Sequence, residues 1–206
     1  MITENASPAV ALAPLDVDDA ELLHTWWSEP VAAHELGHWP RPLSAVREQI
    51  ERDIDDADHD GFLILLPDGT PVGAAALAEQ NMSDGTATVR LLVDPDHRGR
   101  GYGRAALDAL TDLAFGELPL HRIEALPHTG NASALAVLAH AGFTHEGIRR
   151  AACLHRGRRH DIAMLSLLRP EWEALERPRS WDSEQAGQGM PDYSRRARQE
   201  LSDTAW

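Results

Sequence analysis

The chain has 206 residues, of which 43% are hydrophobic, and it carries a formal net charge of −14 at neutral pH. A chain of this length can bury one core, so we expect a single domain with short appendages. The negative charge argues against a general nucleic-acid-binding protein, because such proteins need clustered basic residues to replace phosphate counterions.

The negative charge is concentrated in the first third of the chain. Residues 1–60 hold three arginines against 14 acids, residues 61–177 are close to neutral, and no lysine occurs anywhere. An acidic segment beside an arginine-bearing one is compatible with two kinds of ligand, one cationic and one anionic. On charge alone, an acid-rich solvated surface is the simpler interpretation.

Cys153 is the only cysteine, which excludes an intrachain disulfide and favours a reducing compartment. The first 14 residues lack the basic start and long apolar stretch of a signal peptide. The longest strongly apolar run, FLILL, is too short to span a bilayer. We therefore expect a cytoplasmic protein that does not bind membranes.

Hydrophobic periodicity and turn residues predict a mixed α/β fold. In chain order the predicted elements are a strand at 9–15, helices at 16–27 and 43–54, two strands within 62–79, a strand at 86–93, a helix opened by a glycine-rich loop within 94–115, a strand at 121–126, a helix within 131–143 ended by Gly142, and a strand at 158–168. This order implies one mixed sheet with helices on its faces. Residues 1–8 are interpreted as an N-terminal extension, 9–176 as the domain, and 177–206 as a disordered tail.

The glycine-rich loop is the most informative segment of the chain. Three alternate glycines stand at a strand-to-helix junction, where missing side chains let a ligand approach the backbone and the first helical amides are unpaired. Such amides, at the positive end of a helix, bind phosphate or diphosphate, and three arginines add positive charge. A glycine-rich turn with solvated arginines remains the alternative. The glycines are Gly99, Gly101 and Gly103, and the arginines are Arg98, Arg100 and Arg104.

Two familiar nucleotide motifs do not match this loop. A dinucleotide-binding fingerprint requires G-x-G-x-x-G, whereas the spacing here is G-x-G-x-G. A P-loop requires a lysine before Ser or Thr, and the chain has no lysine.

RGRGYG at residues 98–103 resembles the R/Q-x-x-G-x-G/A signature of the GNAT acetyltransferase superfamily. The flanking segments HRIEA, NASALAVLAHAGF and GRRHDIAMLSLLRPEW, and LLHTWWSEPVAAHELGHWP near the start, resemble in order and spacing the branch that includes ribosomal-protein N-terminal acetyltransferases. The resemblance covers about residues 9–176. It implies a mostly antiparallel sheet whose strands part at the acyl-coenzyme A site, with acetyl-CoA as co-substrate.

The resemblance also implies which residues bind the cofactor. Backbone groups of the strand before the loop would pair with the pantetheine amides, and an amide near Val93 would stabilise the oxyanion. Loop amides would hold the diphosphate. Asn131 matches a family asparagine that contacts the cofactor arm, and it is equally suited to cap the following helix. The implied cofactor residues are Leu91, Leu92, Val93, Arg98, Gly99, Arg100, Gly101, Tyr102, Gly103, Arg104 and Asn131.

The catalytic acid and base depart from the family pattern. Many relatives have a glutamate where this chain has Thr88, and some have a serine where it has Ala134. Glu79, which ends the strand expected to pair with 86–93, is the candidate base, acting through water; a solvated strand-end glutamate is the alternative. Ser133, one residue before Ala134, is the candidate acid.

Residues 34–38 spell HELGH, which matches the H-E-x-x-H zinc motif of metallohydrolases. That motif needs a regular helix, and Pro30, Gly37 and Pro40 disfavour one here. The resemblance places the segment between the first two helices, where the acceptor enters. We therefore interpret it as the lining of an amine pocket rather than a metal site, or else as loop surface. The residues are His34, Glu35, His38 and Trp39.

The sequence therefore predicts an enzyme that transfers acetyl from acetyl-CoA to a primary amine by direct attack in a ternary complex. The acceptor is expected to be an amine, and the acid-rich first third favours a cationic one: a peptide or protein N-terminus, a small amine or an antibiotic. A non-catalytic acyl-CoA-binding module is an alternative, because the acid and base positions are replaced. The chain is expected to be a monomer or homodimer.

Overall fold

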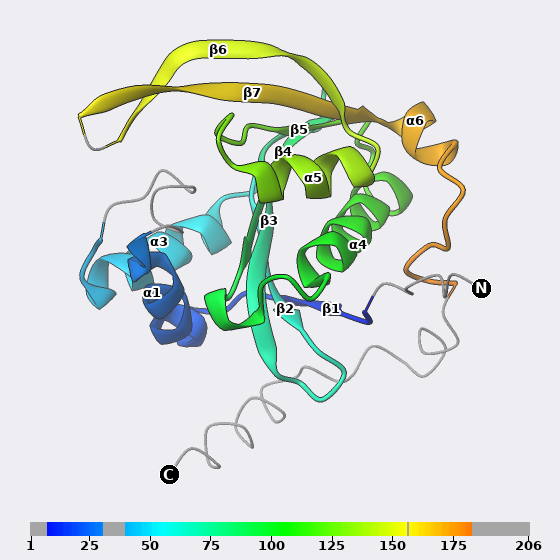
Figure 1. Cartoon of the computed structure of the whole chain (residues 1–206). Coiled ribbons are helices and arrows are strands. Elements are labelled where there is room, and N and C mark those ends of the chain that lie inside the picture. Colours follow the sequence, from blue (N-terminus) through cyan, green and yellow to red (C-terminus); the bar gives the residue numbers. More distant parts are fainter. Residues whose placement is uncertain (1–7, 31–39, 156, 183–206) are drawn as a thin grey trace. The chain divides into compact units, whose positions relative to one another are not determined.

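The computed structural model describes residues 8–30, 40–155 and 157–182 (Figure 1). Along the chain, helices are interspersed among the strands of a single sheet. In chain order the elements are β1 (Ala11–Pro14), η1 (Val17–Asp19), α1 (Ala20–Ser28), α3 (Leu43–Asp55), β2 (Asp60–Leu65), β3 (Pro71–Asn81), β4 (Thr86–Val93), η2 (Pro95–His97), α4 (Tyr102–Gly116), β5 (Arg122–Ala125), α5 (Ala132–His140), β6 (Thr144–His155), β7 (Arg158–Leu168) and α6 (Arg169–Glu173).

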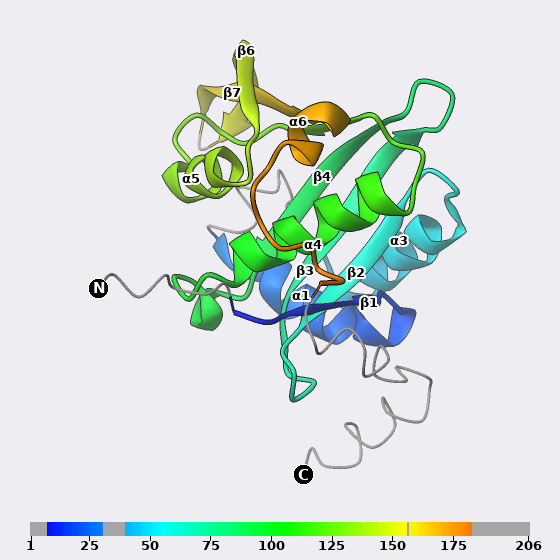
Figure 2. The ribbon, with the colours of Figure 1, turned by 90° about the vertical axis from the view of Figure 1, so that its right-hand side faces the viewer.

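The strands form one seven-stranded sheet in the order β1-β2-β3-β4-β5-β7-β6. Every neighbouring pair is antiparallel except β4 and β5, which run parallel and are joined through α4. Figures 1 and 2 show α4 on one face of the sheet and α1 and α3 on the other. The predicted fold class, a mixed and mostly antiparallel sheet flanked by helices, is confirmed.

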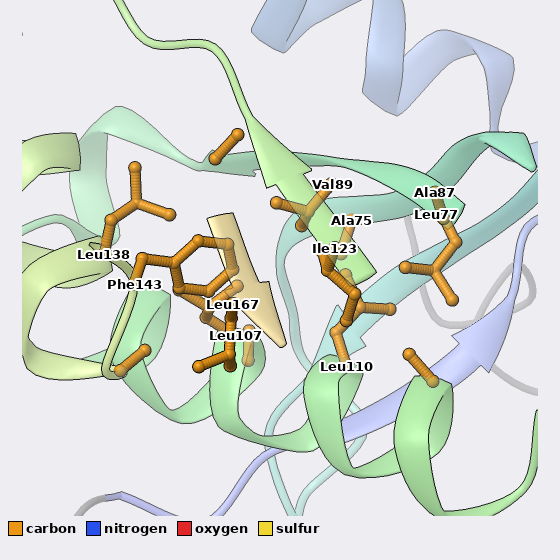
Figure 3. Packing of buried hydrophobic residues seen from close by; sticks show 14 of the residues in the cluster. Ala75, Leu77, Ala87, Val89, Leu107, Leu110, Ile123, Leu138, Phe143 and Leu167 are labelled. Carbon is orange, nitrogen blue, oxygen red and sulfur yellow. The ribbon is translucent and has the colours of Figure 1, made fainter. Parts of the chain in front are cut away.

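The core lies between α4 and the sheet. The helix buries Leu107 and Leu110 completely, because apolar residues three and four apart share one face. They pack against inward-facing strand residues such as Val89 and Ile123, and Phe143 and Leu138 close the α5 end (Figure 3). The predicted amphipathic helix therefore supplies the apolar face against which the sheet packs.

Helix α6 fixes the C-terminal end of α4. The guanidinium of Arg169 donates to the backbone carbonyl of Phe115, in the last turn of α4, and to those of Leu118 and Leu120, between α4 and β5. The buried indole of Trp172 donates from Nε1 to Asp112 Oδ1 on α4, at 2.9 Å. These contacts hold the connection that carries the chain from α4 into β5.

The main error of the sequence prediction is β6. It is a 12-residue strand at the edge of the sheet, and nearly all of its side chains are exposed. An exposed edge strand lacks the alternation of buried and polar residues from which strands are predicted. By contrast, β4 and β7 have the predicted limits, and Gly142 follows α5 with φ +89°, as a helix-ending glycine does.

Contacts divide the chain into residues 1–175 and 176–206. The first unit holds the whole sheet. Most of the segment interpreted as a disordered tail, and residues 1–7 of the N-terminal extension, lie outside the described residues. Among the described helices, none combines the length and apolar character needed to cross a membrane.

We predict that Leu110→Ala lowers the free energy of unfolding by about 2–5 kcal/mol, because it leaves a cavity under the sheet. Met82→Ala is the control, since that side chain is 45% exposed and should change stability little. Denaturant unfolding measures both. Equal losses in the two variants would contradict the placement of the core.

Candidate active site

The parallel strands β4 and β5 pair only at their beginnings. Cα partners run from Thr86 with Arg122 to Thr88 with Glu124, and there the pairing ends. Beyond this point β4 continues beside β3 alone, while β5 continues beside β7. In the described part of the chain, no strand covers the β5 side of β4 after Thr88. We call this parting of the strands the fork.

The fork exposes backbone hydrogen-bonding groups on β4. Leu91, Leu92 and Val93 pair with β3 on one side, at Ala75, Ala74 and Gly73 in turn. The Val93 carbonyl accepts a 3.2 Å hydrogen bond from Arg98 Nε. Backbone groups facing the fork can pair with an extended chain that carries amides, which is the chemistry expected of a pantetheine arm.

The glycine-rich loop follows β4 and turns the chain into α4. Gly99 and Gly101 have φ of +75° and +85°, in the left-handed region that favours glycine. Gly101 is the N-cap residue of α4 and offers no side chain to bond the first helical amides. The first helical hydrogen bond runs from Ala105 N to Gly101 O, so the amides of Tyr102, Gly103 and Arg104 precede it. Amides in this position at a helix N-terminus can bind an anion, so the role predicted for the loop stays a prediction.

Gly103 also has a packing role. A Cβ at this position would lie 3.3 Å from Val93 Cγ2, so the absence of a side chain allows α4 to begin close to the end of β4. The loop amides and the backbone of the fork are therefore neighbours. Tyr102 packs its ring partly against the core, 6.3 Å from the ring of His97.

The three loop arginines all lie at this junction and all face acids or carbonyls. Arg98 Nη2 lies 3.6 Å from Glu29 Oε2 at the end of α1, and Arg100 Nη2 donates to the Asp96 carbonyl. Arg104 Nε lies 4.0 Å from Asp108 Oδ2, and it is buried without a hydrogen-bond partner among the described residues. A diphosphate would supply acceptors for these donors.

Asn131 caps the N-terminus of α5, which is one of the two roles predicted for it. Its Oδ1 accepts hydrogen bonds from the Ala134 backbone at 3.0 Å and from the Ser133 hydroxyl at 2.8 Å. Ser133 is exposed, and its proton is directed at Asn131. The structure therefore joins these two candidates in one small network at the start of α5.

Glu79 lies at the fork because of a β-bulge. Between Ala78 and Asn81, β3 has one residue more than β4, and Glu79 adopts a left-handed φ of +54°. Its carboxylate accepts from Thr88 Oγ1 at 3.4 Å and from Arg90 Nη2 at 3.0 Å. Bulges and strained residues of this kind concentrate near active sites.

The candidate acceptor residues His34, Glu35, His38 and Trp39 lie outside the described residues. The flanking helices α1 and α3 are described, and they lie on the sheet face opposite α4. Among the residues that the structure describes, no group of three or more His, Cys, Asp or Glu side chains could hold a metal ion.

A network of charges on β5, β6 and β7 was not predicted from the sequence. Arg122 donates to Glu124 at 2.8 Å and to both oxygens of Glu146, and Ser166 also donates to Glu146. Hydrogen bonds from Arg122 and Ser166 lower the pKa of Glu146 to about 2, and Glu146 in turn raises that of Arg122. Successive side chains of a strand point to opposite faces, so the predicted strand HRIEA places residues 122 and 124 on the same face. This was the sequence feature from which their contact could have been predicted.

A second missed cluster joins the loop after β5 to the β6–β7 hairpin. Cys153 Sγ lies 3.5 Å from His128 Nδ1, and the rings of His155 and His128 both lie 6.1 Å from that of His160. Burial lowers the pKa of His128, and the nearby His160 and His155 lower it further. Tertiary pairing of β6 with β7 brings these residues together, so their sequence spacing gave no signal.

A family model described as an acetyltransferase (GNAT) domain matches residues 10–144. The chain belongs to the GNAT acetyltransferase family. Members use acetyl-CoA as co-substrate, so this GNAT protein is an acyltransferase that transfers acetyl to an amine. The predicted family, enzyme class and cofactor are confirmed.

Relatives of this acetyltransferase differ in their acceptors. A putative ribosomal N-acetyltransferase of Bacillus subtilis is 30% identical over 184 residues, which cover 84% of this chain and 98% of the relative. An uncharacterized N-acetyltransferase of Bacillus licheniformis is 28% identical over 169 residues, covering 79% and 94%. A spermidine N-acetyltransferase from Vibrio cholerae, solved with CoA and spermine, superposes with a TM-score of 0.76 at 21% identity, covering 80% and 98%.

We predict that Gly99→Ala weakens CoA binding about tenfold, because alanine at φ +75° costs on the order of 1–2 kcal/mol and shifts the loop amides. Gly147→Ala is the matched control. Neither glycine has an atom within 4 Å of an added Cβ, and only Gly99 has a positive φ. Calorimetry with CoA compares the two variants, and equal affinities would contradict the role of the loop.

The Arg122–Glu146 network predicts a stability contribution that depends on pH. Because the pKa of Glu146 is lowered from 4.5 to about 2 on folding, the stabilisation is fully present above about pH 4.5 and is lost as the pH falls towards 2. In Glu146→Gln this pH dependence should disappear. Thermal unfolding from pH 2 to 7 measures it, with exposed Glu117→Gln as control; parallel curves for wild type and Glu146→Gln would contradict it.

Proposed function

We propose that the chain transfers acetyl from acetyl-CoA to the primary amine of a cationic acceptor, by direct attack in a ternary complex at the fork. The observation that carries this proposal is the fork itself, with the open amides of α4 at its cofactor side and the Glu79 carboxylate beside it. An amine held at the fork would lie between the bound thioester and a proton acceptor.

The proposed attack requires a neutral amine. A lysine-like amine costs about 4–5 kcal/mol to deprotonate at pH 7, whereas an α-amine costs only about 1 kcal/mol. A peptide N-terminus therefore makes a smaller demand on the base. The smaller demand of an α-amine fits this site, because Thr88 occupies the position at which many relatives have a glutamate.

Glu79 is the proposed general base, acting through water. Its side chain is 66% exposed, so water can reach the carboxylate, and the bonds from Thr88 and Arg90 fix the carboxylate in place. Thr88 is also the last β4 residue that pairs with β5, so its partner Glu79 stands where the strands part. Ser133 is the proposed proton donor to the leaving thiolate, although its hydroxyl bonds to Asn131 in this structure.

Two acceptor classes are favoured by different observations. The relative at 30% identity is named as a putative ribosomal N-acetyltransferase, which supports a peptide α-amine. Spermidine N-acetyltransferases are more distant, at 21% and 23% identity, but the excess of acids in residues 1–60 supports a polyamine or another multiply charged amine as the second candidate. The undescribed residues His34, Glu35, His38 and Trp39 are proposed to line the acceptor pocket.

An acceptor panel tests the proposal. CoA release from acetyl-CoA is measured with peptides bearing a free α-amine, the same peptides with a blocked N-terminus, spermidine and an aminoglycoside. We expect turnover with the free peptides and none with the blocked ones. CoA binding without turnover on any amine would instead favour a non-catalytic acyl-CoA-binding module.

We predict that Glu79→Gln lowers kcat about 10²-fold or more while leaving CoA affinity unchanged, because glutamine cannot accept the proton. Glu146→Gln is the matched control, since that carboxylate is also bonded by an arginine of another strand but lies towards the other edge of the sheet. Steady-state kinetics and calorimetry separate the two effects. An unchanged kcat in Glu79→Gln would remove Glu79 from the mechanism.

A further inference from the structure

The only cysteine of the chain lies beside a buried histidine. Cys153, on β6, has its Sγ 3.5 Å from Nδ1 and 3.6 Å from Nε2 of His128, in the loop between β5 and α5. Cys153 is partly exposed, whereas His128 is only 9% exposed. A thiol within reach of an imidazole can act as a nucleophile, because the imidazole can accept its proton. We call these two side chains the Cys–His pair.

A bulge in β6 brings the thiol to this position. Cys153 lies opposite His160, and its thiol also donates to the His160 carbonyl at 3.6 Å. In the register shift between Arg149 and Cys153, β6 advances four residues while β7 advances two. Ala151, inside the shift, has a φ of +52°, and its N–H donates to Asp161 Oδ1 at 2.7 Å. A regular strand would place Ala151 opposite His160, so the strained bulge is what aligns the thiol.

The loop that carries the imidazole is fixed at both of its ends. His128 forms an isolated β-bridge with Ile162 of β7, and Thr129 N donates to the Asp161 carbonyl at 3.1 Å. The His128 carbonyl accepts a 2.9 Å hydrogen bond from Asn131 N. Asn131 is the residue expected to contact the cofactor arm. The imidazole and that residue therefore belong to one short turn.

The Cys–His pair lies on the same face of the sheet as the proposed base. Alternate side chains of a strand point to one face, so His160 shares a face of β7 with Ser166. Ser166 lies opposite Glu124, and Glu124 lies opposite Thr88. The Thr88 hydroxyl donates to Glu79 on this face. An acetyl group carried to the fork is therefore brought to the face of the sheet on which the thiol lies.

The environment of His128 suits it to accept a proton. Burial lowers the pKa of this imidazole, and the nearby His160 and His155 lower it further, so the ring is largely neutral at pH 7. A neutral imidazole within hydrogen-bond reach of a thiol can serve as its general base.

We propose that Cys153 is a site of self-acetylation, which takes acetyl from acetyl-CoA by thioester exchange. The Sγ proton passes to His128, and the sulfur attacks the acetyl carbonyl carbon. A new S–C bond forms, and the bond between that carbon and the CoA sulfur breaks. The imidazolium then returns its proton to the CoA thiolate. One thioester replaces another, so no oxidant is needed, and the acetylated fraction follows the ratio of acetyl-CoA to free CoA.

The composition of the chain makes the test specific. The chain has one cysteine and no lysine, so the α-amine of its first residue is the competing primary amine, and acetylation there gives an amide. The full chain is incubated with acetyl-CoA, and its intact mass is measured before and after neutral hydroxylamine, which cleaves thioesters but not amides. We expect one acetyl group that hydroxylamine and excess free CoA both remove, and none of this kind in Cys153→Ser.

A second variant tests the role of the imidazole. His128→Gln should slow acetylation of Cys153 about tenfold or more, because glutamine cannot accept the proton. His145→Gln is the matched control, since it changes an exposed histidine of the same strand. Calorimetry with CoA checks that both variants fold. Glu79→Gln should still be acetylated on Cys153, so failure of this proposal is distinguishable from failure of the proposed amine transfer.

Gly99→Ala distinguishes two sources of the acetyl group. A slower reaction at low acetyl-CoA would identify a donor bound at the glycine-rich loop, and an unchanged rate would identify a donor from solution; acetyl on Cys153 supports the proposal in both cases. Three results would overturn it: no hydroxylamine-sensitive acetyl group on the wild type, such a group remaining in Cys153→Ser, or equal rates in His128→Gln and wild type.

Discussion

The site depends on one constraint, the end of parallel pairing between β4 and β5 after Thr88 and Glu124. Backbone N–H and C=O groups inside a sheet are normally satisfied by the next strand, and a sheet that parts leaves some of them for a ligand. The core maintains this parting, because α4 is packed under both strands by Leu107 and Leu110 and its far end is held by Arg169. The proposed cofactor site thus depends on the way in which α4 connects β4 to β5.

Charge is distributed around the fork in a consistent way. The cofactor side carries the loop amides and arginines, in the manner needed to bind a diphosphate, within a chain that is acidic overall. The β3–β4 side carries Glu79, fixed by Thr88 and Arg90. Further along the sheet, Arg122 and Glu146 neutralise one another and stabilise the strands. The first two groups are the ones that we propose act on a thioester and an amine.

Prediction from the sequence succeeded where one local rule decides the structure. Alternate glycines before an amphipathic helix predicted the loop of residues 98–103, and the limits of β4 and β7 followed from their apolar patterns. It missed β6, because an exposed edge strand has no buried face to show in its sequence. It placed Glu79 at the end of a strand but could not foresee the bulge or the bond to Arg90, since both depend on how two strands align.

The sequence by itself determined the family and the cofactor, through its resemblance to the GNAT acetyltransferases. It also determined the position of the glycine-rich loop, because the backbone conformation of glycine acts over a few adjacent residues. Only the tertiary structure decided which side chains face each other across strands: Glu79 with Arg90, Arg122 with Glu146, and Cys153 with His128. Register and crossover bring together residues up to 25 positions apart in these pairs, and no local pattern encodes such alignment.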